Sequence, residues 1–115
     1  MIGTRCKALQ IFIEDTDMWK GERLADAMVH LLHKRGIAGA TVWNGIMGFG
    51  SHGRIHRKGI FGITDEKPMV ITVIDSEGRL RALVPEILPM VKEGLVALAD
   101  TEVFVAGTEL QQGSS

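Results

Sequence analysis

The order in which two kinds of apolar pattern follow one another constrains the fold of this chain most. Strand-like stretches alternate apolar and polar residues, as at Leu9, Ile11 and Ile13, whereas helix-like stretches repeat every three or four residues, as at Leu24 and Met28. The patterns run strand, helix, strand, strand, helix, strand over residues 7–13, 20–35, 40–44, 69–74, 80–91 and 95–105. This order predicts an α+β fold of the split βαβ type (βαββαβ), with a four-stranded antiparallel sheet and both helices on one face.

Two local signals refine the helices. Lys34 and Arg35 suit the negative end of the first helix dipole, and Gly36 is the expected left-handed residue after it. Pro85 falls inside the second helical pattern, where it removes a backbone hydrogen bond and costs roughly 3 kcal/mol. We therefore expect a kink there, or a helix shorter than the apolar pattern.

One face of the predicted sheet is left without a cover. Residues 69–74 are almost continuously apolar, which is typical of a central strand buried on both faces, and we expect this strand to pair with residues 40–44. Both helices are used on one face, so we expect another subunit to cover the second face. The sequence therefore predicts an oligomer.

Length and charge narrow the class of protein. The 115 residues suit a single domain, which we place at residues 1–106, followed by a flexible polar tail at 107–115. A formal net charge of −1 argues against broad attraction to nucleic acid or anionic lipid. No apolar run approaches the roughly 18 residues that span a bilayer, so direct membrane insertion is not expected. A single cysteine and no signal segment indicate a reducing cytoplasm.

A cluster of glycines and basic residues carries the clearest chemistry. Six glycines lie between the third and fourth segments: Gly45, Gly48, Gly50, Gly53, Gly59 and Gly62. Among them lie the side chains His52, Arg54, His56, Arg57 and Lys58. Glycines let backbone N–H groups turn toward an anion, so the cluster indicates phosphate binding. A solvated loop without a ligand is the competing interpretation.

The neighbouring sequence argues against two other interpretations of this cluster. Residues 48–53 match G-x-G-x-x-G, but residues 54–67 lack the amphipathic helix that a dinucleotide site requires. Residues 45–48 have the form of an RNA-binding clamp, but they follow a strand, and the chain has no tyrosine and few aromatic residues. We therefore expect neither a dinucleotide site nor nucleic-acid binding.

The same segment carries a family resemblance. Gly-Ala-Thr-Val-Trp-Asn-Gly-Ile-Met-Gly-Phe-Gly at residues 39–50, followed by His52 and by Arg-Ile-His-Arg at residues 54–57, strongly resembles the PII-like family known as domain of unknown function 190 (DUF190). The resemblance extends over roughly residues 7–105. It implies a ferredoxin-like fold assembled as a homotrimer, with the sheets packed together at the centre.

The resemblance also implies a ligand. In PII-like trimers, the base of the connection between the second and third strands helps to form an adenine-nucleotide site between neighbouring subunits. The ligand would be AMP, ADP or ATP, with or without Mg²⁺. The residues assigned to it by analogy are Gly45, Met47, Gly48, Phe49, Gly50, His52, Arg54, His56 and Arg57. Among them, Arg54, His56 and Arg57 are the charge-assisted donors to phosphate.

The implied function is that of a non-enzymatic signalling regulator in which the glycine-rich loop at residues 45–60 responds to the ligand. The tyrosine that PII proteins carry in their signature loop has no counterpart, so regulation by uridylylation is not implied. Some relatives are linked with fluoride-channel proteins, which makes an unidentified protein or a membrane transporter a candidate target.

Two alternatives stay open. His52 and His56 supply half of a tetrahedral metal site, so the same architecture suits a trimeric metal-binding protein. Slow hydrolysis of a bound nucleotide would need a carboxylate near the loop, for which Asp65 and Glu66 are the candidates. No nucleophile with an adjacent base is evident, so no catalytic residue is predicted.

Overall fold

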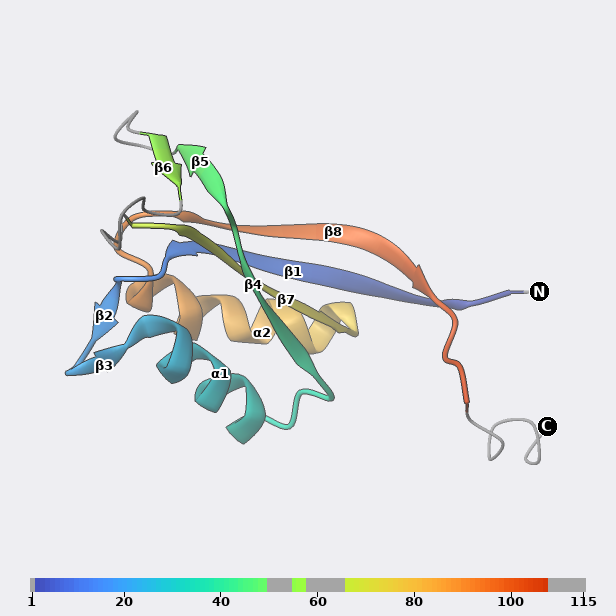
Figure 1. The fold of residues 1–115 in the computed structure, drawn as a ribbon. Coiled ribbons are helices and arrows are strands. Elements are labelled where there is room, and N and C mark those ends of the chain that lie inside the picture. The colour runs from blue at the N-terminus through green and yellow to red at the C-terminus, as the bar shows by residue number, and fades with distance from the viewer. Residues whose placement is uncertain (1, 50–54, 58–65, 108–115) are drawn as a thin grey trace.

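The computed structural model describes residues 2–49, 55–57 and 66–107. Its central element is a four-stranded antiparallel sheet in the order β4-β7-β1-β8. The strands are β1 (Thr4–Glu14), β4 (Ala40–Asn44), β7 (Pro68–Asp75) and β8 (Leu95–Val103). The helices α1 (Leu24–Lys34) and α2 (Glu77–Ile87) lie on the same face of this sheet (Figure 1). The predicted fold class and the pairing of residues 40–44 with the fourth segment are confirmed.

The core lies between the sheet and the two helices. Alternate residues of the central strands point into it, and Leu9, Ile11 and Ile71 are completely buried. Met28 of α1 and Leu80 of α2 meet them from the helix side and are also completely buried. The period of two in the strands and the longer helical period in the helices therefore place their apolar residues in one common layer.

The helix ends follow the sequence signals. Gly36 has a φ of 78°, the left-handed conformation expected after α1. The Ser76 hydroxyl accepts a hydrogen bond from the Arg79 amide at 3.4 Å and caps α2. With Pro85 in its last turn, α2 ends at Ile87 and continues as a short 3₁₀ helix. The helix is therefore shorter than the apolar pattern, as expected.

The start predicted for the first helix is wrong. Residues 20–23 belong to a small hairpin formed by β2 (Met18–Trp19) and β3 (Glu22–Arg23), and α1 begins only at Leu24. Lys20 and Gly21 form its turn with φ values of 48° and 86°. Positive φ at both central residues is the mark of the tight hairpin turn whose twist matches that of its strands. Residues 20–23 contain no apolar residue, so the apolar period itself begins only at Leu24.

The connection after β4 is more regular than the loop predicted from its glycines. Two short strands, β5 (Met47–Phe49) and β6 (Ile55–Arg57), pair antiparallel within it. At the end of the sheet, β8 stops at Val103, two residues earlier than predicted. Neither difference changes the order of the sheet.

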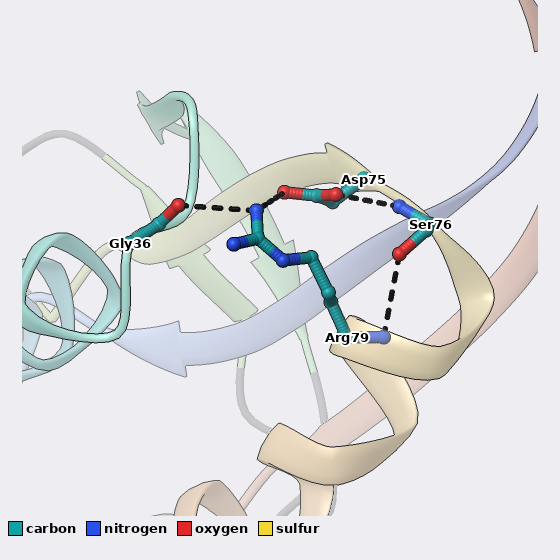
Figure 2. A network of polar contacts seen from close by, with 4 residues as sticks. All are labelled: Gly36, Asp75, Ser76 and Arg79. Atoms are coloured by element: carbon teal, nitrogen blue, oxygen red, sulfur yellow. Dashed lines mark hydrogen bonds and ion pairs between the residues drawn. The ribbon is translucent and has the colours of Figure 1, made fainter.

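A network of polar contacts links the segment after α1 to the start of α2 (Figure 2). The Arg79 guanidinium donates to the Gly36 carbonyl oxygen at 3.2 Å and forms an ion pair with Asp75 at 3.4 Å. The second Asp75 carboxylate oxygen accepts from the Ser76 amide at 2.7 Å. Arg79 thereby ties the end of α1 to the junction between β7 and α2.

A second link connects the helices near their C-terminal ends. The Arg35 Nε donates to both carboxylate oxygens of Glu86, at 2.9 and 3.1 Å. This hydrogen bonding holds the pKa of Glu86 below its usual value. Both side chains are well exposed, so the link contributes little to stability.

Among the elements that the structure describes, no helix lies on the sheet face opposite α1 and α2 (Figure 1). Trp43, Ile74 and Leu95 lie on it and are 58%, 44% and 56% exposed. The indole N–H of Trp43 donates to the hydroxyl of Thr72 on the adjacent strand at 3.0 Å, so the ring lies along this face. Among the described residues, no helix combines the length and the apolar character needed to cross a membrane.

The Arg79 network predicts a measurable contribution to stability. Replacing Arg79 with alanine leaves the mostly buried Asp75 and the Gly36 carbonyl without their partner, so the free energy of unfolding should fall by about 1 kcal/mol. Arg81→Ala is the matched control, because Arg81 pairs with Glu77 on the exposed surface of the same helix, and it should lower the free energy of unfolding by clearly less than Arg79→Ala. Urea denaturation of both variants tests this difference, and equal losses would contradict it.

Candidate functional site

A groove of about 770 Å³ lies where β1 ends, β7 begins and β4 leads into β5. Its lining residues come from four separate parts of the chain: Phe12, Ile13, Glu14, Gly45, Met47, Gly48, Phe49, Pro68, Met69, Val70, Glu93, Gly94 and Leu95. A volume of this size falls within the range of small-molecule sites. Most of the lining is apolar, and backbone groups of glycines and two carboxylates interrupt it.

The side formed by the predicted loop is held against Pro68. The Gly45 amide donates to the Pro68 carbonyl oxygen at 2.7 Å. A Cβ atom at Gly45 would lie 2.6 Å from the Pro68 ring, and one at Gly48 would lie 3.3 Å from it. Because only glycine allows so close an approach at Gly45, the entry to the loop passes directly over the start of β7.

A second glycine shapes the opposite side. Gly94 has a φ of 142°, and a Cβ atom there would overlap the carbonyl oxygen of Phe12. This close approach brings the chain before β8 against the end of β1, where Leu95 pairs with Phe12. Glu93 and Leu95 therefore flank a backbone position that is fixed by its contact with β1.

Polar contacts fix the end of β1. The Asp15 amide donates to the Lys67 carbonyl oxygen at 3.0 Å, and the Lys67 amide donates to the Asp15 carboxylate at 3.1 Å. These bonds extend the pairing of Glu14 with Pro68 by one residue. The Glu14 amide in turn donates to the Asp17 carboxylate at 3.0 Å. The backbone that carries Glu14 into the groove is therefore held from both sides.

The structure brings together part of the predicted site. Gly45, Met47, Gly48 and Phe49 all line the groove. His56 and Arg57 lie on β6, where the register places them opposite Gly48 and Met47. The other predicted residues, Gly50, His52 and Arg54, lie outside the described residues.

Sequence reasoning assigned none of the residues Phe12, Glu93 and Leu95 in the opposite wall of the groove to a site. Phe12, Glu14, Glu93 and Leu95 lie at strand ends that are far apart in the sequence, and only the sheet register brings them together. Gly94, a lone glycine immediately before a strand, is a sequence signal that points to this wall.

The residues of the two alternatives are only partly described. His52 and Asp65 lie outside the described residues. Within residues 2–49, 55–57 and 66–107, no group of three or more His, Cys, Asp and Glu side chains is placed to hold a metal ion.

The contact of Gly94 with Phe12 predicts a sharp effect of substitution. Gly94→Ala should lower the free energy of unfolding by about 3 kcal/mol or more, because the new Cβ atom overlaps a backbone oxygen and φ is unfavourable for a side chain. Gly78→Ala is the control: Gly78 lies in α2 with open space around it, so alanine should be neutral or stabilise by up to about 1 kcal/mol. Thermal unfolding of both variants measures the difference, and a stable Gly94→Ala protein would refute the role given to this contact.

Comparison with solved structures identifies the fold. The nitrogen regulatory PII-like protein CPII from Thiomonas intermedia K12, solved bound to ADP, AMP and bicarbonate, superposes with a TM-score of 0.67 at 21% identity, covering 90% of this chain and 100% of that one. A further CPII structure, bound to ADP and bicarbonate, gives a TM-score of 0.62 at 24% identity over 87% of this chain and 89% of the other. The chain therefore has the fold of PII-like proteins.

Relatives in sequence cover nearly the whole chain. A UPF0166 protein of Methanocaldococcus jannaschii is 30% identical over 90% of this chain and 96% of its own length. A UPF0166 protein of Aquifex aeolicus is 30% identical over 85% of this chain and 92% of its own length. The family model DUF190, described as "Uncharacterized ACR, COG1993", matches residues 6–103. The chain thus belongs to the DUF190 family.

Proposed function

We propose that this protein is a PII-like regulator, not an enzyme, and that it binds an adenine nucleotide in the groove at the base of the loop at residues 45–60. The observation that carries the proposal is the groove itself, whose mostly apolar lining includes the glycine-containing β5. The PII-like protein CPII, which shares the fold, was solved with ADP and AMP bound.

The groove offers what the two ends of a nucleotide require. Phe12, Met69 and Leu95 give an apolar surface for a planar base. Gly48 on β5 has no side chain between its backbone and a phosphate. We propose Arg54, His56 and Arg57 as the charged donors to that phosphate.

We also propose that the site is completed between subunits of a homotrimer. Phe12, Val70 and Leu95 line the groove, and they lie on the sheet face that the helices leave uncovered. A second copy packed on this face would therefore border the groove. Large exposed apolar surface of this kind is typical of a protein interface.

The regulatory step would start at β5. A ligand that contacts Gly48 and Phe49 acts on the strand that leads into the rest of the loop. Contacts that favour one arrangement of such a segment change the surface that a target protein meets. We propose this as the way in which nucleotide occupancy is signalled.

Assembly is tested by sedimentation. At micromolar concentration the protein should sediment as a species of three times 12.6 kDa, because the exposed apolar face is then covered by neighbouring subunits. Trp43→Glu places a charge on that face and should shift the protein toward monomer. Glu22→Gln, which changes a charge on the β2–β3 hairpin, is the control and should leave the trimer intact. A wild-type monomer would refute the proposed assembly.

Ligand binding is tested by titration. AMP, ADP, ATP, cyclic AMP and cyclic di-AMP are compared by thermal shift, with and without Mg²⁺, and any ligand that shifts the transition is measured by calorimetry. A ligand at 100 times its Kd stabilises the folded state by about 2.7 kcal/mol, which gives a clear shift. If none of these compounds shifts the transition or gives a binding heat, the proposed function is wrong.

The proposed phosphate donors provide the matching variants. The double variant Arg54→Ala and Arg57→Ala should weaken nucleotide binding by about tenfold or more, because each charge-assisted hydrogen bond contributes about 1.5–3 kcal/mol. The trimer should survive this change. Arg81→Ala on α2, where Arg81 pairs with Glu77, should leave affinity unchanged. Unaltered affinity in the double variant would remove both arginines from the site.

A further inference from the structure

Asp15 lies just outside the groove, directly after the last residue of β1. One oxygen of its carboxylate accepts a hydrogen bond from the Lys67 amide at 3.1 Å, and the other lies 3.8 Å from the Lys67 ammonium. Lys67 directly precedes Pro68, which lines the groove, whereas neither Asp15 nor Lys67 is among the described lining residues. Asp15 is therefore placed to act on the groove through Lys67 and not by contact with a ligand.

The Asp15 carboxylate takes the place of a main-chain carbonyl group. In an antiparallel sheet, the two residues of a hydrogen-bonded pair exchange two bonds between their backbones. The Asp15 amide donates to the Lys67 carbonyl oxygen at 3.0 Å, but the Lys67 amide donates to the Asp15 side chain. The main chain turns away here, because the Asp17 amide donates to the Glu14 carbonyl oxygen at 3.1 Å and closes a turn. A short side chain with an acceptor oxygen, as in aspartate or asparagine, therefore completes the pair.

The segment that Asp15 holds continues into the lining of the groove. Pro68 has no amide hydrogen, so it cannot donate to a neighbouring strand, and the bond to the end of β1 comes from the Lys67 amide before it. The Pro68 carbonyl oxygen accepts from the Gly45 amide at 2.7 Å, and a Cβ atom at Gly45 would lie 2.6 Å from the Pro68 ring. Two hydrogen bonds thus connect Asp15 to Gly45 by way of Lys67 and Pro68.

Loss of the Asp15 carboxylate would act on the shape of the groove. The Lys67 amide would lose its acceptor at a place where 78% of the Lys67 side chain and 84% of the Asp15 side chain are shielded from water, since 22% and 16% are exposed. A segment relieves such a loss by moving toward water. Pro68 and Gly45 would move with it, because they are in close contact. Fewer molecules would then hold the groove in its present shape, and the apparent affinity falls by the same factor.

We infer that Asp15 is a positioning residue of the nucleotide site: its carboxylate holds the Lys67 amide and so keeps Pro68 and Gly45 in the arrangement that receives the ligand. This inference rests on the proposed function, and it adds to it a residue that controls binding from outside the groove. The role requires an acceptor oxygen and not a negative charge. The Lys67 ammonium, 3.8 Å from the carboxylate, is too distant for a hydrogen bond.

Two substitutions separate the acceptor from the charge. Asp15→Ala removes the acceptor, and it should weaken the binding of AMP, ADP and ATP by about fivefold or more, as measured by calorimetry below the unfolding transition of each variant. Asp15→Asn retains an oxygen for the Lys67 amide, so it should restore affinity to within about twofold of wild type. If Asp15→Asn binds as weakly as Asp15→Ala, the charge is what matters and the inference is overturned.

Asp75 provides the matched control (Figure 2). One of its oxygens accepts from the Ser76 amide at 2.7 Å, the other pairs with Arg79 at 3.4 Å, and 14% of its side chain is exposed. It lies at the opposite end of β7 from Pro68, so Asp75→Ala should destabilise the protein but leave affinity within about twofold of wild type. An equal loss of affinity in Asp75→Ala and Asp15→Ala would mean that destabilisation alone weakens binding, and the role of Asp15 would be wrong.

Amide hydrogen exchange tests the same role without a variant, and it therefore decides the matter even where Asp15→Ala does not fold. A nucleotide whose affinity depends on the Lys67 contact must, by reciprocity, stabilise that contact when it binds. Saturation of the wild-type protein with AMP, ADP or ATP should slow exchange at the Lys67 amide more than at the Ser76 amide, which Asp75 holds. An equal change at both amides would contradict the inference.

The outcomes separate this inference from the proposed function. A wild-type protein that binds none of the three nucleotides refutes the proposed function and, with it, the role of Asp15. A wild-type protein that binds one of them, together with an Asp15→Ala variant that binds it equally well, keeps the function and overturns the role of Asp15.

Discussion

The antiparallel pairing of β1 with β7 is the constraint on which the rest of the structure depends. It runs from Lys7 opposite Asp75 to Glu14 opposite Pro68, and the hydrogen bonds between Asp15 and Lys67 extend it. The Gly45 amide is bound to the Pro68 carbonyl at the same place. Both ends of the segment between β4 and β7 are therefore anchored at one point beside the groove.

The same pairing links the candidate site to the exposed sheet face. In a strand, alternate residues point to opposite faces, so the register that buries Ile11 and Ile71 turns Phe12 and Val70 the other way. Phe12 and Val70 line the groove as well. A subunit that covers the sheet face therefore also approaches the groove. Assembly and ligand binding, both proposed here, depend on one set of backbone positions.

Local sequence patterns predicted the fold, but they predicted only one side of the candidate site. Neighbouring residues predict the order of strands and helices, the end of α1 at Gly36 and the short α2 with Pro85. The structure confirms all three predictions. The hairpin before α1 was missed because the helix was extended back to Lys20, before its first apolar residue Leu24, and periodicity does not show that Lys20 adopts a positive φ. The loop side of the groove is contiguous in sequence and was predicted from a motif. The side with Glu14 and Glu93 is created by long-range register, which leaves no spacing rule in a single sequence.

The net charge of the chain does not show how charge is distributed locally, and the local distribution bears on the proposed ligand. A net charge of −1 averages over the whole chain, whereas the sequence at residues 52–58 carries Arg54, Arg57 and Lys58 and no acidic residue. Long-range attraction depends on the total charge, whereas the orientation of a bound molecule depends on the charges within a screening length of about 8 Å. The proposed ligand has an uncharged ring at one end, which suits an apolar surface, and phosphate at the other, which suits basic side chains. Inorganic phosphate, which has no uncharged end, would leave the apolar wall of Phe12 and Leu95 without a role.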